Sequence, residues 1–225
     1  MVSKWRLKRD AIARPVDSRQ FVDDILGQLA ASRFGPGAWG VFFGRSLARS
    51  AAQARGRPEA ATEVTLLHLP AFALGARRWA VGSWFLAITH LGLLGDRETL
   101  GWPNRLTLLR ALLPALAPSS KWTSVAALAT DFADGPLARR GSETAFGAFA
   151  DPIADGVFWS WYALRWERNR WLRWVPLTLF GTTTGAIAIA YFAKGRSIDY
   201  PRIEAFRFVS GAAEMLLAFR ALRST

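Results

Sequence analysis

The chain has 225 residues, 51% of them hydrophobic, and 29 basic against 17 acidic residues give it a formal net charge of +12. It contains no cysteine, which excludes a disulfide framework, a thiolate zinc site and a cysteine nucleophile. Any metal must therefore be held by oxygen ligands or by His68 and His90.

The positive charge lies between apolar runs. Arg77 and Arg78 precede one long apolar run, and a group of arginines separates two others: Arg165, Arg168, Arg170 and Arg173. This alternation is typical of the ends of membrane helices, whereas a nucleic-acid-binding protein gathers its cations on one polar face. We therefore expect a membrane protein that does not bind nucleic acid.

Tryptophans mark the margins of the same runs: Trp159, Trp161, Trp166, Trp171 and Trp174. Amphipathic indole rings favour the membrane interface, so we interpret these residues as an interfacial belt. The alternative, that they are ordinary core aromatics, stays open.

Residues 1–60 are predicted to form a basic, amphipathic region in the cytoplasm or at the membrane interface. Asp17 or Ser18 can cap a helix with one apolar stripe, whose members recur at helical spacing: Phe21, Val22, Ile25, Leu26 and Leu29. A second amphipathic stretch runs from Trp39 to Leu47. Each stripe either lies in the headgroup plane or packs against another helix.

The remaining chain contains apolar runs at 64–76, 79–95, 144–164, 171–193 and 205–222, and a helical hairpin over 102–134 that turns near Pro118. A spanning helix needs about 20 residues. We predict an all-α, polytopic membrane bundle of about five to six transmembrane helices. Residues 61–100 add an extra apolar segment, a transmembrane helix, and 101–225 form the membrane core.

Four carboxylates lie inside or beside these apolar runs: Asp131, Asp134, Asp151 and Asp155. Each costs about 2.5 to 3.5 kcal/mol at the centre of a membrane helix, so cations must balance them. The spacings of three and four residues place each pair on one face of a helix. Two facing helices can then bring four carboxylates into one cavity.

Oxygen ligands without histidine or cysteine select hard cations such as Mg²⁺, Mn²⁺ or Ca²⁺, and Mg²⁺ is commonly bound together with substrate phosphates. The ligand set thus indicates a diphosphate substrate. Gly135 and Gly147 permit close approach of a ligand, and Arg139 can bind a phosphate through its planar guanidinium group.

These residues closely resemble the signature of the CDP-alcohol phosphotransferase (CDP-alcohol phosphatidyltransferase) family, D-x2-D-G-x2-A-R-x7or8-G-x3-D-x3-D, with seven residues between Arg139 and Gly147. Every fixed position is present, from Asp131 through Gly135, Ala138 and Arg139 to Asp155. An upstream stretch from Pro103 to Arg110, with Asn104 and Thr107, is similar to the start of the first core helix of the family.

The resemblance implies an integral membrane enzyme that moves a phosphatidyl or similar phosphoalcohol group from a CDP-linked donor to an acceptor hydroxyl and releases CMP. It implies two Mg²⁺ or Mn²⁺ ions held by Asp131, Asp134 and Asp151, with Asp155 as general base and further metal ligand. By the same resemblance, six residues line the CDP pocket: Asn104, Thr107, Gly135, Ala138, Arg139 and Gly147.

Within the family, the string from Thr144 to Asp155 is most similar to phosphatidylglycerophosphate synthases, which implies glycerol 3-phosphate as acceptor and a role in phospholipid biosynthesis. Cations that could bind the acceptor phosphate are Arg140, Lys194, Arg196 and Arg202. The resemblance also implies an inner or plasma membrane location, an active site facing the cytoplasm, contact with membrane lipid, and a homodimer.

Other interpretations stay open. The acceptor could instead be inositol phosphate, serine or phosphatidylglycerol, or the chain could be a non-catalytic relative of the family. A prenyltransferase also holds Mg²⁺ with aspartate-rich helices but lacks the Gly-x-x-Ala-Arg element. A cation or proton transporter would require an internal repeat, and the two halves of the chain show none.

Overall fold

The computed structural model describes residues 18–140, 144–197 and 204–223, and of 133–140 and 204–207 the backbone alone. Every regular element in these ranges is a helix, which confirms the all-α prediction for this part of the chain. The α-helices are α3 (Ser18–Ala31), α4 (Pro36–Arg55), α5 (Pro58–Ala73), α6 (Arg77–Thr89), α7 (Gly101–Leu116), α8 (Thr123–Arg140), α9 (Ala145–Trp166), α10 (Val175–Lys194) and α11 (Glu204–Arg223). Short 3₁₀ turns, η1 (Leu91–Leu94) and η2 (Leu172–Trp174), follow α6 and precede α10.

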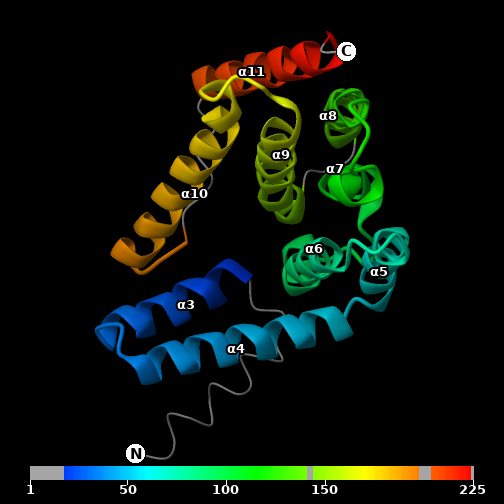
Figure 1. Ribbon diagram of the computed structural model, residues 1–225. Coiled ribbons are helices and arrows are strands. Elements are labelled where there is room, and N and C mark those ends of the chain that lie inside the picture. Colours follow the sequence, from blue (N-terminus) through cyan, green and yellow to red (C-terminus); the bar gives the residue numbers. More distant parts are fainter. Residues whose placement is uncertain (1–17, 141–143, 198–203, 224–225) are drawn as a thin grey trace, which may run out of the picture.

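α7 packs against both α8 and α9, and in Figure 1 it lies beside α9, between α8 and the pair of α5 and α6. The hairpin of α5 and α6 covers one side of α7, while α10 and α11 contact α9. The turn between α7 and α8 falls at 117–122, as the hairpin prediction requires. Helices from the N-terminal half thus enlarge the bundle that carries the aspartates.

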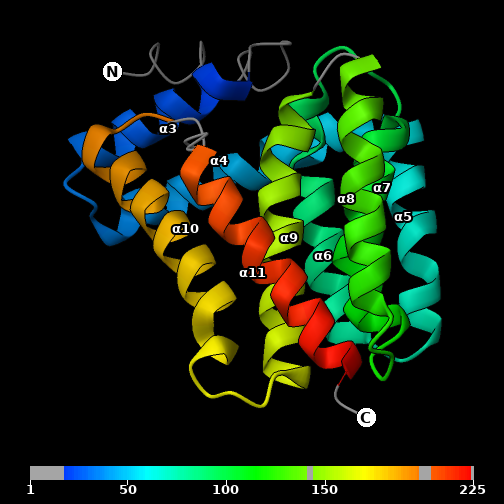
Figure 2. The ribbon, with the colours of Figure 1, turned by 90° about the horizontal axis from the view of Figure 1, so that it is seen from above.

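The first two helices, α3 and α4, form an antiparallel pair that lies as a separate layer on one side of the bundle, below α6 and α10 in Figure 1, and Figure 2 shows this pair nearer the end where α8 ends and α9 begins. α3 buries its apolar stripe, including Phe21, Ile25 and Leu29, so this stripe packs within the protein. α4 instead leaves large apolar side chains exposed, among them Phe43 and Leu47. Only the second amphipathic helix therefore presents an apolar face to its surroundings.

The core consists of separate clusters between neighbouring helices. One joins α5, α6, α7 and α9 around Phe146, and another joins α8, α9 and α11 around Phe158. Trp159 is 3% exposed in the second cluster, so its interpretation as an interfacial residue is wrong. Trp171 and Trp174, at 74% and 53%, are exposed as that interpretation requires.

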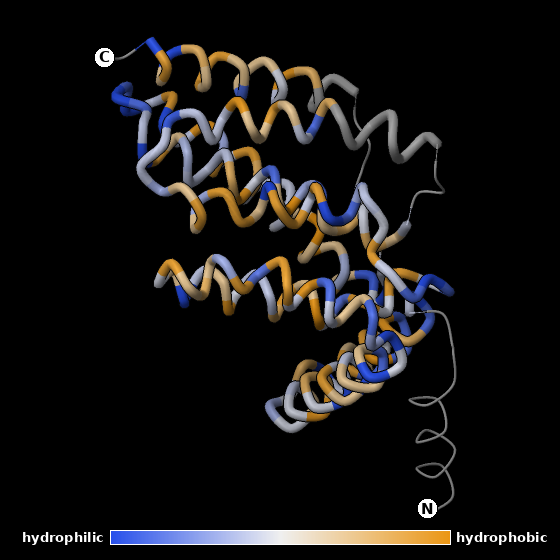
Figure 3. The backbone as a smooth tube through the Cα atoms, turned by 90° about the vertical axis from the view of Figure 1, so that its right-hand side faces the viewer, coloured by the Kyte–Doolittle hydropathy of each residue, from blue (hydrophilic) through white to orange (hydrophobic). Residues whose placement is uncertain are grey.

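The number of membrane spans is not confirmed. Of the described helices, one segment, Leu172–Lys194, is long and apolar enough to cross a membrane, with a mean hydropathy of 1.4 and 6% of its apolar window buried. Apolar and hydrophilic residues alternate along most helices, and strongly hydrophilic residues are concentrated at several helix ends (Figure 3). α9 has sufficient length, but Asp151, Asp155 and Arg165 lower its hydropathy.

Candidate active site

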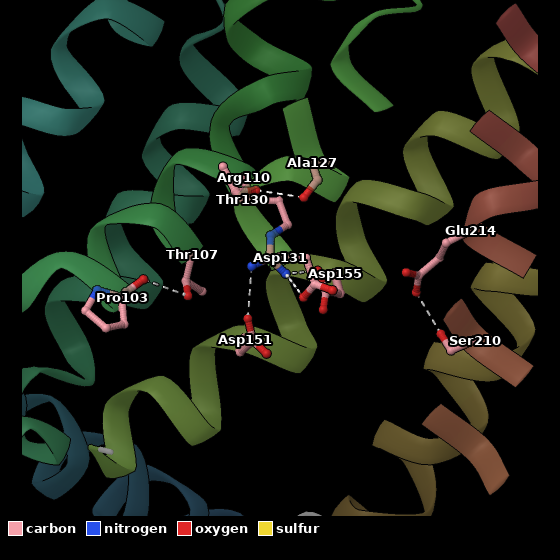
Figure 4. Close-up of polar contacts among 10 residues, drawn as sticks. All are labelled: Pro103, Thr107, Arg110, Ala127, Thr130, Asp131, Asp151, Asp155, Ser210 and Glu214. Atoms are coloured by element: carbon pink, nitrogen blue, oxygen red, sulfur yellow. Dashed lines mark hydrogen bonds and ion pairs between the residues drawn. The ribbon is translucent and has the colours of Figure 1, made fainter. Parts of the chain in front are cut away.

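Three of the four aspartates meet in one cluster. Asp131 projects from α8, and Asp151 and Asp155 project from successive turns of α9 (Figure 4). One carboxylate oxygen from each lies within 4.8 Å of the other two. This is a set of hard oxygen ligands of the kind that binds Mg²⁺ or Mn²⁺.

A buried arginine, Arg110, connects these carboxylates. Its guanidinium group is fully buried and lies 3.3 Å from Asp131 Oδ1 and 3.3 Å from Asp151 Oδ1, and it also pairs with Asp155 (Figure 4). The planar guanidinium can bind several carboxylates at once in a way that a lysine ammonium cannot. Arg110 was not among the site residues expected from the sequence, although a cation within an apolar helix near four aspartates is a recognisable signal.

The helix that carries Arg110 adds to the expected arrangement. Carboxylates of two helices, α8 and α9, converge as expected, and both helices also pack against α7, which brings Arg110 between their carboxylates. The spacing of three or four residues is correct for one face of a helix. It contains no information about a third helix that joins the two.

The first turns of α7 and α9 are joined through Asn104. Its side-chain amide donates to Leu100 O at 2.6 Å and lies 3.1 Å from Thr144 Oγ1, while Gly147 N donates to the same hydroxyl at 3.0 Å. A Cβ at Gly147 would lie 2.8 Å from Asn104 Oδ1. A side chain at position 147 would therefore displace the amide of Asn104, and the two residues lie beside each other at this contact between helices.

Thr107, the other predicted CDP-binding residue of α7, is 3% exposed and donates to the backbone carbonyl of Pro103 at 3.2 Å. A further carboxylate, Glu214 of α11, accepts a hydrogen bond of 2.8 Å from Ser210 and points towards the aspartate cluster (Figure 4). Glu214 interrupts an apolar run in the sequence, which is the signal that could have identified it.

Several predicted site residues lie outside the described side chains: Asp134, Gly135, Ala138, Arg139, Arg140 and Arg202. Except for Arg202, their backbone belongs to α8. Lys194 and Arg196 flank Gly195, which ends α10 in a left-handed conformation with φ 59° and lies against Gly27 of α3. These two cations therefore stand beside α3.

The neighbouring Ser197 donates to Asp23 Oδ1 from its backbone N–H at 2.5 Å and from its hydroxyl at 2.6 Å. These hydrogen bonds hold the pKa of Asp23 below its ordinary value, with a smaller contribution from the nearby charge of Arg196. Arg196 thus already faces an acidic residue of α3.

A family model described as CDP-alcohol phosphatidyltransferase matches residues 100–221, more than half of the chain. The chain belongs to this family. The matched range contains α7 to α10, nearly all of α11, and the whole aspartate cluster. No curated protein and no solved structure gives a significant match.

Membership defines the class of reaction. Enzymes of the CDP-alcohol phosphatidyltransferase family are transferases of substituted phosphate groups that move a phosphatidyl group from a CDP-alcohol to an acceptor alcohol. The family is membrane-associated and generally depends on divalent metals. α3 to α6 lie before the matched range and add to it.

Proposed function

We propose that the aspartate cluster is the transfer site for a CDP-linked lipid donor, with CDP-diacylglycerol as the preferred example. The acceptor hydroxyl oxygen bonds to the phosphorus that carries the lipid, the bond from this phosphorus to the bridging oxygen breaks, and CMP leaves with the electron pair. The observation that carries this proposal is the convergence of Asp131, Asp151 and Asp155 within 4.8 Å, inside the matched range.

The donor set fits a divalent cation, because three carboxylate oxygens converge without any nitrogen or sulfur ligand among the described residues. Asp131, Asp134, Asp151 and Asp155 would hold Mg²⁺ or Mn²⁺, two ions in our proposal. When bound, these ions would neutralise the diphosphate and the charge that develops on the departing CMP.

We assign Asp155 the role of general base. Its carboxylate accepts the proton of the acceptor hydroxyl as the new oxygen–phosphorus bond forms. The ion pair with Arg110 fixes the orientation of this carboxylate before substrate arrives. An oriented base is more effective than a mobile one, because no free energy is then needed to align it in the transition state.

The nucleotide is assigned to the end of the site formed by Asn104, Thr107 and Gly147, together with residues of α8: Gly135, Ala138 and Arg139. The hydrogen-bonded contact of Asn104 with Thr144 supports this assignment, since it provides amide and hydroxyl groups beside a glycine. The planar guanidinium of Arg139 would bind a donor phosphate.

For the acceptor we propose glycerol 3-phosphate, as in phosphatidylglycerophosphate synthases, with inositol phosphate, serine and phosphatidylglycerol as alternatives. The support is the string from Thr144 to Asp155. Arg140, Lys194, Arg196 and Arg202 remain the candidate ligands of an acceptor phosphate.

We place the protein in the inner or plasma membrane with its site towards the cytoplasm, and we propose a homodimer. Exposed large apolar side chains support contact with lipid, among them Phe132 at 70%, Ile189 at 71% and Phe208 at 79%.

The test is CMP release by the purified full chain from CDP-diacylglycerol with Mg²⁺ or Mn²⁺, against each acceptor and a no-acceptor control. We expect acceptor-dependent release that Asp155→Asn lowers about 100-fold or more, since a general base contributes at least that factor. Asp96→Asn, an exposed aspartate outside the cluster, serves as matched control. Release without acceptor, or no release by folded protein with any acceptor, would contradict the proposal.

A further inference from the structure

An apolar cavity of about 330 Å³ lies between α6, α7 and α9. α6 forms one wall with residues from Arg78 to Ala87, while the opposite wall comes from Thr107 to Ala111 and from Phe146 to Val157. The three helices are neighbours in the bundle (Figure 1). α6 precedes the family-matched range, so this cavity depends on a helix that the family model does not include.

The polar side chains of the wall are mostly engaged elsewhere. Trp79 Nε1 donates to Ala111 O at 2.8 Å, the hydroxyl of Ser83 lies 3.0 Å from His68 Nε2, and Thr107 donates to a carbonyl one turn earlier. A polar ligand would lose its hydrogen bonds to water without gaining replacements here. The interior of the cavity therefore suits a hydrocarbon chain, and the hydrogen bonds of Trp79 and Ser83 hold α6 in place as a preformed wall.

The charge of the cavity is confined to one end. Arg78, near the first residue of α6, is the charged side chain among the lining residues. Within the described part of the chain, no carboxylate pairs with it. An exposed arginine at one end of an apolar cavity matches an amphiphile with a phosphate at one end and a hydrocarbon chain along the rest.

The length of the cavity agrees with this ligand. From Arg78 to Ala87 the wall covers ten residues of helix, which span nine rises of 1.5 Å, or about 14 Å. Half of the roughly 30 Å hydrocarbon core of a bilayer is about 15 Å. A cavity of this length accommodates one acyl chain of one leaflet along α6, from Arg78 towards Phe149, whose ring stacks on His90 with centroids 4.0 Å apart.

We propose that this cavity binds one acyl chain of an anionic bilayer phospholipid, with the phosphate at Arg78 and the end of the chain near Phe149. Asp131 projects from α8, and Asp151 and Asp155, although they belong to α9, are not part of the cavity wall. In this proposal the lipid is a ligand additional to the donor and acceptor, and its binding does not depend on turnover. Of the residues assigned to the CDP pocket, Thr107 also lines this cavity, so the two ligands would be neighbours.

Native mass spectrometry of the full chain with added phosphatidylglycerol or phosphatidylcholine tests this site. We expect a phosphatidylglycerol adduct that Arg78→Gln weakens about fivefold, the contribution expected of one cation near a lipid headgroup. Gly82→Leu should remove the adduct, because a Cβ at Gly82 points into open space in the cavity. Arg77→Gln and Gly185→Leu are the matched controls, since neither residue lines the cavity.

Folding of each variant is checked by thermal unfolding, and Val157→Phe narrows the same cavity from α9 if Gly82→Leu does not fold. A photoreactive group at the end of the acyl chain should label the Leu86 and Phe149 end. The proposal would be overturned if phosphatidylcholine bound as well as phosphatidylglycerol, or if both Gly82→Leu and Val157→Phe kept the lipid adduct. It would also be overturned if the control variants lost the adduct to the same extent, or if the photoreactive group labelled residues beside Arg78. Lipid binding without CMP release would leave it standing while contradicting the proposed enzyme activity.

Discussion

Replacing Arg110 with methionine tests whether one buried cation holds the carboxylate cluster together. The substitution keeps most of the side-chain volume and removes the guanidinium group that contacts Asp131, Asp151 and Asp155. Three carboxylates then repel one another without a compensating charge. We expect the folded state to lose stability whenever no divalent ion takes the place of the guanidinium.

The expected loss in the free energy of unfolding follows from the burial of the Arg110 guanidinium and of its carboxylate partners. Removing one partner of a fully buried ion pair costs about 3 to 5 kcal/mol. The guanidinium is fully buried, but the carboxylates of Asp131, Asp151 and Asp155 retain 46%, 41% and 26% of their exposure, so solvent screens part of the repulsion. We therefore expect a loss of about 2 to 3 kcal/mol, and at roughly 2 to 4 °C per kcal/mol this lowers Tm by about 4 to 12 °C.

The assay is thermal unfolding in detergent, with a chelator or with saturating Mg²⁺. Bound Mg²⁺ compensates the carboxylates, so it should recover at least half of the loss in Arg110→Met. Arg105→Met is the matched control, because Arg105 is partly exposed and pairs with Glu63 outside the cluster. Its loss should stay within about 1 kcal/mol and be independent of metal. Equal losses in the two variants, or no metal effect on Arg110→Met, would refute the reasoning.

Three further predictions follow from local contacts. Gly147→Ala should raise the KM for the CDP donor about tenfold because its Cβ displaces Asn104, whereas a purely structural contact would lower Tm and leave KM unchanged. Gly156→Ala should lower Tm by roughly 2 to 6 °C, because its Cβ would lie within 3 Å of the Phe180 ring. Adding Phe180→Leu removes this clash and should restore most of the lost Tm. A loss that persists in the double variant would contradict the packing argument. Hydrogen bonds from Arg220 lower the pKa of Glu167, so this ion pair stabilises the fold above pH 4.5, and its contribution is lost as the pH falls through the lowered pKa. Glu167→Gln should therefore flatten the acidic part of a curve of Tm against pH. An unchanged curve would contradict the assignment.

Much of the helical framework could be predicted from apolar runs and their boundaries. The stripe from Phe21 to Leu29 predicts α3, and the runs at 144–164 and 171–193 predict α9 and α10 closely. The number of membrane spans could not be predicted in the same way, because charged residues such as Asp151 lie within helices of sufficient length. Apolar length alone does not distinguish a spanning helix from one packed inside a bundle.

The aspartate cluster was predictable because helical periodicity fixes which side chains of one helix share a face. The position of Arg110 was not, because periodicity does not say which helix packs between two others. Trp159 was misinterpreted for a related reason. A tryptophan at the margin of an apolar run can face either lipid or the core, and only the packing of α9 against α8 and α11 distinguishes them.

The most direct test of the central claim is CMP release from CDP-diacylglycerol by the full chain in which Asp131 or Asp151 is replaced by asparagine. Asparagine preserves the shape of each side chain and removes the charge that would hold the metal. We expect both variants to lose at least about 100-fold in kcat/KM while Asp96→Asn retains the wild-type rate. Cluster variants that remain as active as Asp96→Asn would contradict the assignment of this site.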